Sequence, residues 1–316
     1  MSKRILICGA NGFIGKNLLK RFYRRKGFNI RATYFNTAPD MNFDVEWVKV
    51  DLRDKEDVRN SLKDVDIVLQ YAAVTSGAKD IIERPHIHIA DNAIMNSLLF
   101  SEAVASGVEH FVFPSCTIMY QSSDIPVRES DFDESKDVNE KYFAGAHTKV
   151  YLEKMCRFYA STGKTKFTVL RQSNIYGPHD KFDLEKGHVF AATIAKVSQS
   201  EDFITVWGSG EEERDLLYVE DLADCIELII SKQKDKYQLI NVGAGTSVSV
   251  SKLVQDIVAA SGKNLKIRYD VSKPTIKTKL ALDVTRAYDD FGWKPKSSLK
   301  FGIHETLKWL REDKYE

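Results

Sequence analysis

The sequence predicts an α/β fold built around a parallel β-sheet, and two features of the chain lead to this expectation. Short apolar runs alternate with segments of helical periodicity through the first half of the chain. A glycine-rich turn follows the first apolar run directly and opens the first helical segment. Repeated strand–helix alternation predicts a doubly wound sheet covered by helices on both faces, with ligands bound at the carboxyl ends of its strands.

The individual elements follow from the same patterns. The expected strands are 4–8, 29–34, 47–50, 66–70, 110–113 and 168–171, and the expected helices between them are 14–25, 55–62, 92–106 and 147–161. Beyond about residue 172, loops rich in Gly, Pro and charge introduce shorter elements. We therefore expect a dinucleotide-binding domain over 1–171, to whose sheet 239–245 returns, and a smaller α/β substrate-binding lobe mainly over 172–316. The segment 307–316 is expected to be a surface helix.

Bulk composition excludes several classes of partner. The 316 residues are 43% apolar and 29% charged with a net charge of +1, which indicates neither a nucleic-acid nor a membrane partner. No apolar run is long enough to span a bilayer, and the first residues do not resemble a signal peptide. The four cysteines are widely spaced, so we expect no metal site, no disulfide framework and a reducing cytoplasm.

The glycine-rich turn predicts a site for a dinucleotide. Gly9, Gly12 and Gly15 stand between the first expected strand and the first expected helix. Glycines there allow a tight turn and close approach of backbone N–H groups to a pyrophosphate, and the helix amino terminus adds a partial positive charge. The sheet is therefore interpreted as Rossmann-like, with a cofactor contacted by six loop residues: Gly9, Asn11, Gly12, Phe13, Ile14 and Gly15.

The choice of dinucleotide depends on residues after the second and third strands. Tyr34 and the two residues that follow it supply neither the acid that binds an NAD ribose nor a base for the extra phosphate of NADP. These residues favour NAD and leave NADP open. Asp51 and Leu52 end the third expected strand, where the carboxylate suits either the adenine amino group or a helix cap.

Several further motifs resemble one family over essentially the whole chain. These are the glycine turn, Tyr71-Ala72-Ala73, Lys149, Asn174-Ile-Tyr-Gly-Pro-His179-Asp, His188-Val189, Val206-Trp207-Gly-Ser-Gly210, Arg214-Asp-Leu-Leu-Tyr-Val-Glu-Asp221 and Asn241-Val-Gly-Ala-Gly245. In order and spacing they are similar to the extended short-chain dehydrogenases/reductases that modify nucleotide sugars, most closely the GDP-L-fucose synthase group.

The resemblance implies NAD(P)-dependent chemistry on a nucleoside-diphosphate sugar. Tyr71, Ala72, Ala73 and Lys149 would contact the nicotinamide cofactor in the first lobe, and the sugar nucleotide would lie under the second. In such enzymes a Ser or Thr, a Tyr and a Lys share the proton transfer that accompanies hydride transfer. The resemblance also implies a homodimer formed through the helices 92–106 and 147–161.

The chain departs from the family pattern at three positions. Gly145 stands four residues before Lys149, where the family has its Tyr, and Cys116 stands at the Ser/Thr position. Ile118 replaces the cysteine that the GDP-L-fucose synthases use for epimerisation, although their histidine is matched by His179. Cys116 offers only a weak S–H donor, so its neighbours Ser115 and Thr117 are better candidates to hold the reacting oxygen.

Tyr142 is the residue we expect to replace the missing tyrosine. Lys149 is seven positions after Tyr142, so in one continuous helix the two side chains would differ by about 20° around the axis and share a face. They would also lie ~10 Å apart along the axis. A helix that begins near Gly145 would leave Tyr142 in the entering loop, free to fold over a substrate. The alternative is a packing aromatic. His147 points about 160° away from Lys149 and is a weaker candidate.

Six residues are candidates for the sugar nucleotide. Arg214 suits a diphosphate because its guanidinium binds oxygen pairs, unless its acidic neighbours neutralise it. Lys279 is a second phosphate candidate, and Asn174 and His179 follow a strand end at the ligand edge. Trp207 suits either the base or the core, and His188 either the substrate or the surface. A guanine base is implied only by the resemblance.

Three functions remain open from the sequence. The leading one is a dehydrogenase or keto-reductase that interconverts hydroxyl and ketone at carbon 4 of a GDP-sugar, without the epimerase step that Ile118 makes doubtful. The second is a 4-epimerase or dehydratase on the same class of sugar. The third is a protein that binds dinucleotide without catalysis and senses redox state.

Overall fold

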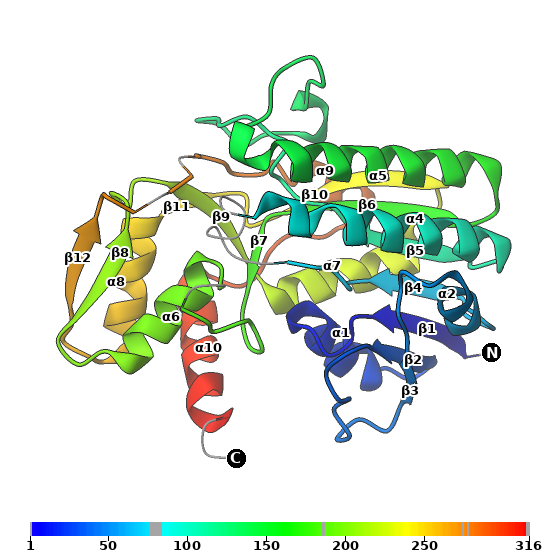
Figure 1. Cartoon of the computed structure of the whole chain (residues 1–316), viewed down its shortest axis with the longest axis horizontal. Coiled ribbons are helices and arrows are strands. Elements are labelled where there is room, and N and C mark those ends of the chain that lie inside the picture. Colours follow the sequence, from blue (N-terminus) through cyan, green and yellow to red (C-terminus); the bar gives the residue numbers. More distant parts are fainter. Residues whose placement is uncertain (1, 76–83, 185–186, 274, 277, 314–316) are drawn as a thin grey trace.

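The computed structural model describes residues 2–75, 84–184, 187–273, 275–276 and 278–313. Figure 1 shows two lobes, a larger one around a parallel sheet and a smaller one that holds β8, β12, α6 and α8. The strands of the large sheet are β1 (Lys3–Cys8), β2 (Phe28–Tyr34), β3 (Glu46–Lys49), β4 (Ile67–Gln70), β5 (His110–Pro114), β6 (Lys166–Gln172) and β10 (Tyr237–Val242).

All seven strands of this sheet run parallel, in the order β10-β6-β5-β4-β1-β2-β3. The order reverses at β1, so that β2 and β4 flank it with Ile5 level with both Ile30 and Ile67. The predicted doubly wound Rossmann-like sheet is confirmed. A crevice opens at such a reversal, outside the carboxyl ends of the strands, and this is where ligands bind.

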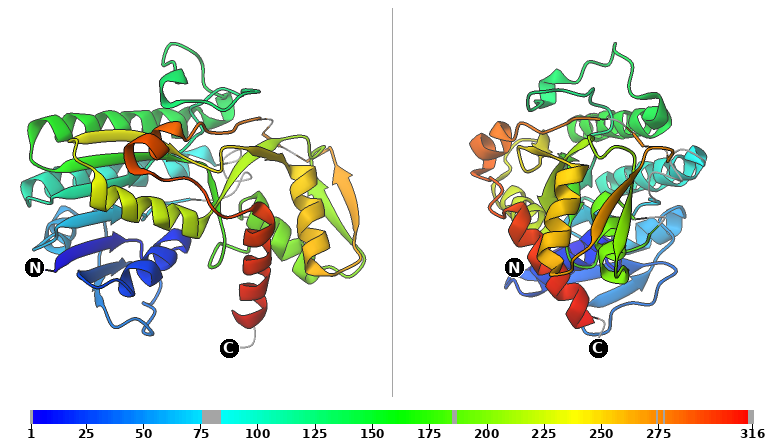
Figure 2. Two further views of the ribbon diagram at one scale, coloured as in Figure 1. Left: turned by 180° about the vertical axis from the view of Figure 1, so that it is seen from behind. Right: turned by 90° about the vertical axis from the view of Figure 1, so that its left-hand side faces the viewer.

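Alternation along the strands separates two cores. Ile5 and Ile7 of β1 face one side, whereas Leu6 and Cys8 face the other. The first side is covered by α1 (Phe13–Tyr23), α7 (Val219–Lys232) and α9 (Thr285–Phe291). The second is covered by α2 (Lys55–Ser61), α4 (Ala90–Ala105) and α5 (Phe143–Thr162). Figure 2 shows the sheet enclosed between these two helix layers. With both faces covered, the central strands β1 and β4 are mostly apolar, whereas β2, β6 and β10 also contain buried polar residues.

The smaller lobe is built from two short sheets and three helices. One sheet has the order β11-β9-β7, from β7 (Asn174–Tyr176), β9 (Glu213–Tyr218) and β11 (Ser247–Ser249). The other pairs β8 (Phe203–Trp207) with β12 (Lys266–Asp270). The helices α6 (Val189–Gln199), α8 (Val250–Ser261) and α10 (Leu299–Asp313) pack on them around a third apolar core. Phe13, at the start of α1, packs against this core and so connects the lobes.

The chain crosses between lobes more often than a single boundary at residue 172 implies. β10 returns to the large sheet beside β6, and α7 and α9 cover the same face as α1. Within α10, helix begins at Leu299, eight residues before the expected start at 307; residues 314–316 of the expected helix lie outside the described part of the chain. Local signals mark where several helices begin and end. Asp54 and Ser249 cap the amino termini of α2 and α8, and Gly262 and Gly292 adopt the left-handed conformation at the carboxyl ends of α8 and α9.

Gly302 is a point of close contact between α10 and β7 within the small lobe. A Cβ at this position would lie 2.2 Å from the hydroxyl oxygen of Tyr176, whose ring is fully buried against Phe190. We expect Gly302→Ala to lower the free energy of unfolding by about 1–2 kcal/mol, because overpacking outweighs the gain in helix propensity of about 1 kcal/mol. Denaturant titration measures this, with exposed Lys300→Ala as the control. Equal stability of both variants would contradict the prediction.

Candidate active site

The glycine turn at the end of β1 has the geometry of a pyrophosphate cradle. Gly9 has φ +70°, and a Cβ there would lie 2.7 Å from the backbone of Ala72, while a Cβ on Gly15 would lie 2.1 Å from the carbonyl oxygen of Gly9. Gly12 is the N-cap of α1 and brings no side-chain cap, and the first turn of α1 contains no acid. The helix dipole and the N–H groups of this turn are therefore available to an anion.

Asn11 fixes this turn against the segment after β2. Its Nδ2 donates to the carbonyl oxygens of Thr37 and Ala38 at 3.0 and 2.7 Å. Its Oδ1 is buried and has no hydrogen-bond partner among the described residues. A bound group with a donor would satisfy that oxygen. The turn thus fits a dinucleotide, with Phe13 and Ile14 contributing backbone N–H groups while their side chains pack into different cores.

At the adenosine end of the cradle, the structure adds a residue that the sequence did not suggest. Arg53 binds Asp51 with two nitrogens at 2.9 and 2.8 Å and lowers the pKa of that carboxyl. The same guanidinium lies 5.5 Å from the ring centre of Phe35. The carboxylate of Asp51 is thus held by a cation, neither capping a helix nor lying free for adenine. Tyr34 packs on Trp47, and the Leu52 side chain is buried in the core.

The segment after β4 forms the opposite wall. Ala72 contacts Gly9 through its backbone, and Gln70 bonds both the N–H and the carbonyl of Ala72 at 3.1 Å. Tyr71 packs in the core and Ala73 is part of the exposed edge of the turn. These contacts fix the carboxyl end of β4 beside the glycine turn.

Lys149 lies at the carboxyl end of β5. Its Nζ donates to the carbonyl oxygen of Pro114 at 2.7 Å and lies 4.8 Å from the ring centre of Phe113. Burial lowers the pKa of Lys149, and Cys116, Glu153 and Cys156 oppose that shift. The ammonium therefore lies at the sheet edge that binds ligands, where the resemblance places a cofactor-holding lysine.

A buried ion pair lies directly beneath Lys149. Glu153, one turn further along α5, accepts from Arg171 on β6 at 2.7 Å, and both side chains are almost fully buried. Arg171 also donates to the hydroxyl of Tyr120 at 2.9 Å and to the carbonyl of Glu129 at 3.1 Å. This network, missed from the sequence, ties α5 to the loop that follows β5. Its only sequence signal is an Arg inside a buried strand, which requires a partner.

Three neighbouring residues are candidates to hydrogen-bond the reacting oxygen of a substrate, and their side chains have different surroundings. Ser115 is buried and donates its hydroxyl to Glu153, so it faces the ion pair and is not available to a substrate. Cys116 packs with Met119 and Val150 in a small apolar cluster, and burial raises the pKa of its thiol. Thr117 lines a pocket between the lobes. Among the three, Thr117 is the hydroxyl that a substrate can meet.

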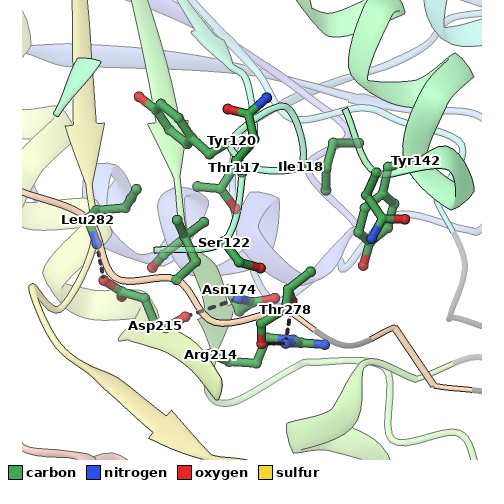
Figure 3. Close-up of a pocket in the computed structure, with 14 residues that line it drawn as sticks. Thr117, Ile118, Tyr120, Ser122, Tyr142, Asn174, Arg214, Asp215, Thr278 and Leu282 are labelled. Atoms are coloured by element: carbon green, nitrogen blue, oxygen red, sulfur yellow. Dashed lines mark hydrogen bonds between the residues drawn. The ribbon is translucent and has the colours of Figure 1, made fainter. Parts of the chain in front are cut away.

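Tyr142 lines the same pocket (Figure 3). It is the N-cap of α5, which begins at Phe143, two residues before the start near Gly145 that we considered. Burial raises the pKa of Tyr142, while Arg214 opposes the shift and Cys116 adds to it. The phenol therefore lies near both the loop after β5 and the guanidinium of the second lobe. His147 is exposed further along α5 and contacts the ring of Phe143 in an edge-on arrangement, with ring centroids 4.6 Å apart.

The second lobe contributes the pocket floor. Arg214 donates to the carbonyl oxygens of Ile276 and Thr278 at 2.8 and 3.0 Å, and Asn174 donates to the carbonyl of Asp215 at 3.1 Å. Among described residues, no carboxylate forms an ion pair with Arg214, so its acidic neighbours do not neutralise it. Buried Asp215 accepts from the N–H groups of Ala244, Gly245 and Leu282 and fixes the surrounding segments.

Four other candidates lie outside this pocket. Lys279 is exposed and paired with Asp124 and Glu213 at 3.1 and 3.3 Å, so its charge is already neutralised. Trp207 lies at the end of β8, with Lys196 and Lys273 near its ring. His188 is the exposed N-cap of α6, and His179, at φ +67°, packs on Trp309 at 4.7 Å.

Two features are absent from the described part of the chain. No group of three or more His, Cys, Asp or Glu side chains in that part of the chain could hold a metal ion. No helix within the described ranges is long and apolar enough to cross a bilayer.

The fold and the site together define a dinucleotide-binding enzyme with a second lobe over the carboxyl edge of the sheet. A family model described as "NAD dependent epimerase/dehydratase family" matches residues 5–243. The chain belongs to this family. It is an NAD(P)-dependent enzyme of nucleotide-sugar metabolism, as the resemblance implied.

Relatives match along nearly the whole chain. A dTDP-4-dehydro-6-deoxy-D-allose reductase of a Streptomyces species is 28% identical, covering 98% of this chain and 96% of the relative. A GDP-L-fucose synthase of Sinorhizobium fredii is 28% identical, covering 97% and 95%. The crystal structure of a Thermotoga maritima UDP-glucose 4-epimerase with UDP-glucose has the same fold, at a TM-score of 0.86, 24% identity, and coverage of 98% and 99%.

The ion pair beneath Lys149 generates a prediction with two readouts. We expect Glu153→Gln to lower the free energy of unfolding by about 3 kcal/mol, because Arg171 then stays buried without a countercharge. The variant also removes a negative charge that favours protonated Lys149, so the pKa of Lys149 falls. An activity that needs the ammonium is lost as pH rises through that pKa, so the alkaline limb of the pH profile moves to lower pH.

Ser115→Ala is the matched control, because it removes a hydrogen bond to Glu153 and leaves the carboxylate charged. It should lower stability by about 1 kcal/mol with an unchanged alkaline limb. An unchanged limb in Glu153→Gln would show that the carboxylate does not act on Lys149.

Proposed function

We propose that this protein is an NAD(P)-dependent oxidoreductase that interconverts hydroxyl and ketone at carbon 4 of a GDP-sugar, a hexose or heptose. The observation that carries the proposal is one pocket between the lobes, lined by Thr117 and Tyr142 on one side and by Arg214 on the other. Relatives of nearly full length include a 4-dehydro-sugar reductase and GDP-L-fucose synthases, which supports this substrate class.

Each group has a defined role in the proposed reaction. A reduced nicotinamide, when bound at the glycine turn and Lys149, would provide the hydride for the carbonyl carbon. Tyr142, which lines the pocket, would donate its phenolic proton to the oxygen. Thr117 hydrogen-bonds the same oxygen. Lys149, held by Pro114, orients the nicotinamide ribose, and Arg214 and Asn174 hold the diphosphate or sugar.

The proposal extends to the rest of the chain, including three residues outside the pocket. We assign dinucleotide binding to 1–171 together with 239–245, and sugar-nucleotide binding mainly to the rest of 172–316. Trp207 and His188 are proposed to reach the nucleotide and His179 the sugar. We place the enzyme in the cytoplasm, where such reactions supply precursors for polysaccharides.

Two other functions make different predictions. A dehydratase would need an acid/base pair near carbons 5 and 6 of the sugar, and no Asp-Glu pair follows Cys116 to provide it. A 4-epimerase needs no such pair and differs from the proposed enzyme in its product. A dinucleotide sensor would not need Arg214 free of carboxylates over the cofactor edge. Both features favour a simple dehydrogenase or reductase.

A panel assay separates the three functions. Purified protein is incubated with NAD or NADP, oxidised or reduced, and with GDP-, UDP- and dTDP-sugars in hydroxyl and 4-keto forms. Net change in reduced-nicotinamide absorbance with a GDP-sugar supports the proposal. A sugar product without net change in reduced-nicotinamide absorbance indicates the epimerase or dehydratase. Neither an absorbance change nor a product in any combination indicates the sensor.

Tyr142 is tested by replacement. Tyr142→Phe removes only the hydroxyl, so we expect kcat to fall about 10²–10⁴-fold with little change in KM, because general acid catalysis is lost while binding contacts remain. Tyr151→Phe, on the exposed side of α5, is the control and should keep wild-type kcat. Activity of Tyr142→Phe within a few-fold of wild type would eliminate the assignment.

We further propose a homodimer formed through α4 and α5. Ile94 on α4 is 45% exposed, and Tyr151 and Phe158, two turns apart on α5, are 52% and 60% exposed. Large apolar side chains aligned on one face of a helix pair are typical of a covered interface.

The dimer is tested by charge. Tyr151→Glu with Phe158→Glu should convert a species of about twice 35.9 kDa into one of 35.9 kDa in sedimentation, because charges are costly in an interface core. Tyr288→Glu on α9, 56% exposed, is the control and should sediment as the wild type does. A wild type that sediments as a monomer would refute the dimer.

A further inference from the structure

The space beside Gly145, where the family has its tyrosine, is occupied by the side chain of Ile118. Gly145 lies in the first turn of α5, and a Cβ built on it would lie 3.2 Å from Cδ1 of Ile118. Carbon atoms pack favourably at about 3.5–4.0 Å, so even one methyl group would press on Ile118. A tyrosine at 145 would have to extend a whole ring from that point.

Ile118 is held in place by its surroundings. It packs against a buried cluster of Met119, Val138, Ala146 and Val150, together with Cys116 and Phe132. Displacing it would disturb packing on the loop after β5 and on α5 at once. Ile118 also lines the pocket, and Figure 3 shows its side chain between those of Thr117 and Tyr142.

We propose that Ile118 and Gly145 are a matched pair that excludes a side chain from position 145 and thereby makes Tyr142 the proton donor. The exclusion needs both residues. With a smaller residue at 118 and Gly145 unchanged, the space would stay empty. With a tyrosine at 145 and Ile118 unchanged, the new ring would clash with Ile118. Three residues separate Tyr142 from 145, a shift of about 4.5 Å along the helix axis. Tyr142 and Arg214 line the same pocket, so the acid–base group shares it with the guanidinium of the second lobe. Ile118 is a specificity-determining residue in this account.

The pairing itself is tested by stability, without reference to activity. We expect Gly145→Ala to lower the melting temperature when Ile118 is present. In an Ile118→Ala background the same substitution should raise it, since alanine is the better helix former. Such a change of sign in the double-mutant cycle supports the pair. Equal effects of Gly145→Ala in both backgrounds would overturn it.

The choice of donor is tested by moving it, and this arm rests on the proposed function. The readout is turnover of the sugar nucleotide that gives the largest signal in the panel. In a Tyr142→Phe background, adding Gly145→Tyr should raise turnover less than two-fold over Tyr142→Phe alone while Ile118 remains. When Ile118→Ala is also present, it should raise turnover at least ten-fold. Gly145→Phe in the Ile118→Ala, Tyr142→Phe background is the matched control without a hydroxyl and should recover nothing.

Recovery of equal size with and without Ile118 would overturn the proposal, as would no recovery in either background. A failed assignment of Tyr142 has a different signature. Tyr142→Phe would then be as active as wild type, while the melting temperatures would still report whether Ile118 and Gly145 are coupled.

Discussion

The buried pair between Arg171 and Glu153 is the interaction on which the site depends. It joins β6 to α5, and its two ends reach Tyr120 and Ser115, on the loop after β5. Two charges taken out of water are tolerated only when every remaining donor and acceptor finds a partner. The network therefore admits few arrangements of this loop. One consequence is the position of Pro114, whose carbonyl holds Lys149.

A second constraint is close backbone packing around the glycine turn. Gly9 approaches Ala72 and Gly15 approaches Gly9 at distances that leave no space for a side chain. This packing brings the carboxyl ends of β1 and β4 together and leaves the amino terminus of α1 uncapped toward the crevice. The same edge of the sheet thus presents an anion site and, two strands away, an ammonium group. These are the requirements for binding a nicotinamide dinucleotide across a strand-order reversal.

The departures from the family pattern form one consistent set. Gly145 removes a side chain, Ile118 fills the space beside it, and Tyr142 enters the pocket from the N-cap of α5. Thr117 faces the pocket where Cys116 does not. Considered singly, each change suggests loss of catalysis. Under the proposed function, they together describe a site whose hydroxyl and phenol have moved by one to three residues while the lysine has stayed.

The large sheet, the glycine turn and Lys149 could be predicted from the sequence because each depends on local signals: apolar strand runs, glycines at fixed spacing, and a lysine in a helix. The strands expected at 4–8 and 29–34 lie in the sheet, and of the segment 239–245 that was expected to return to it, 239–242 lie in β10. Tertiary structure decided what local patterns do not encode. Only packing shows that Ser115 turns toward Glu153, that Lys279 is neutralised by Asp124, and that Arg53 lies over Phe35. Those contacts join residues far apart in the chain or side chains whose direction depends on their neighbours.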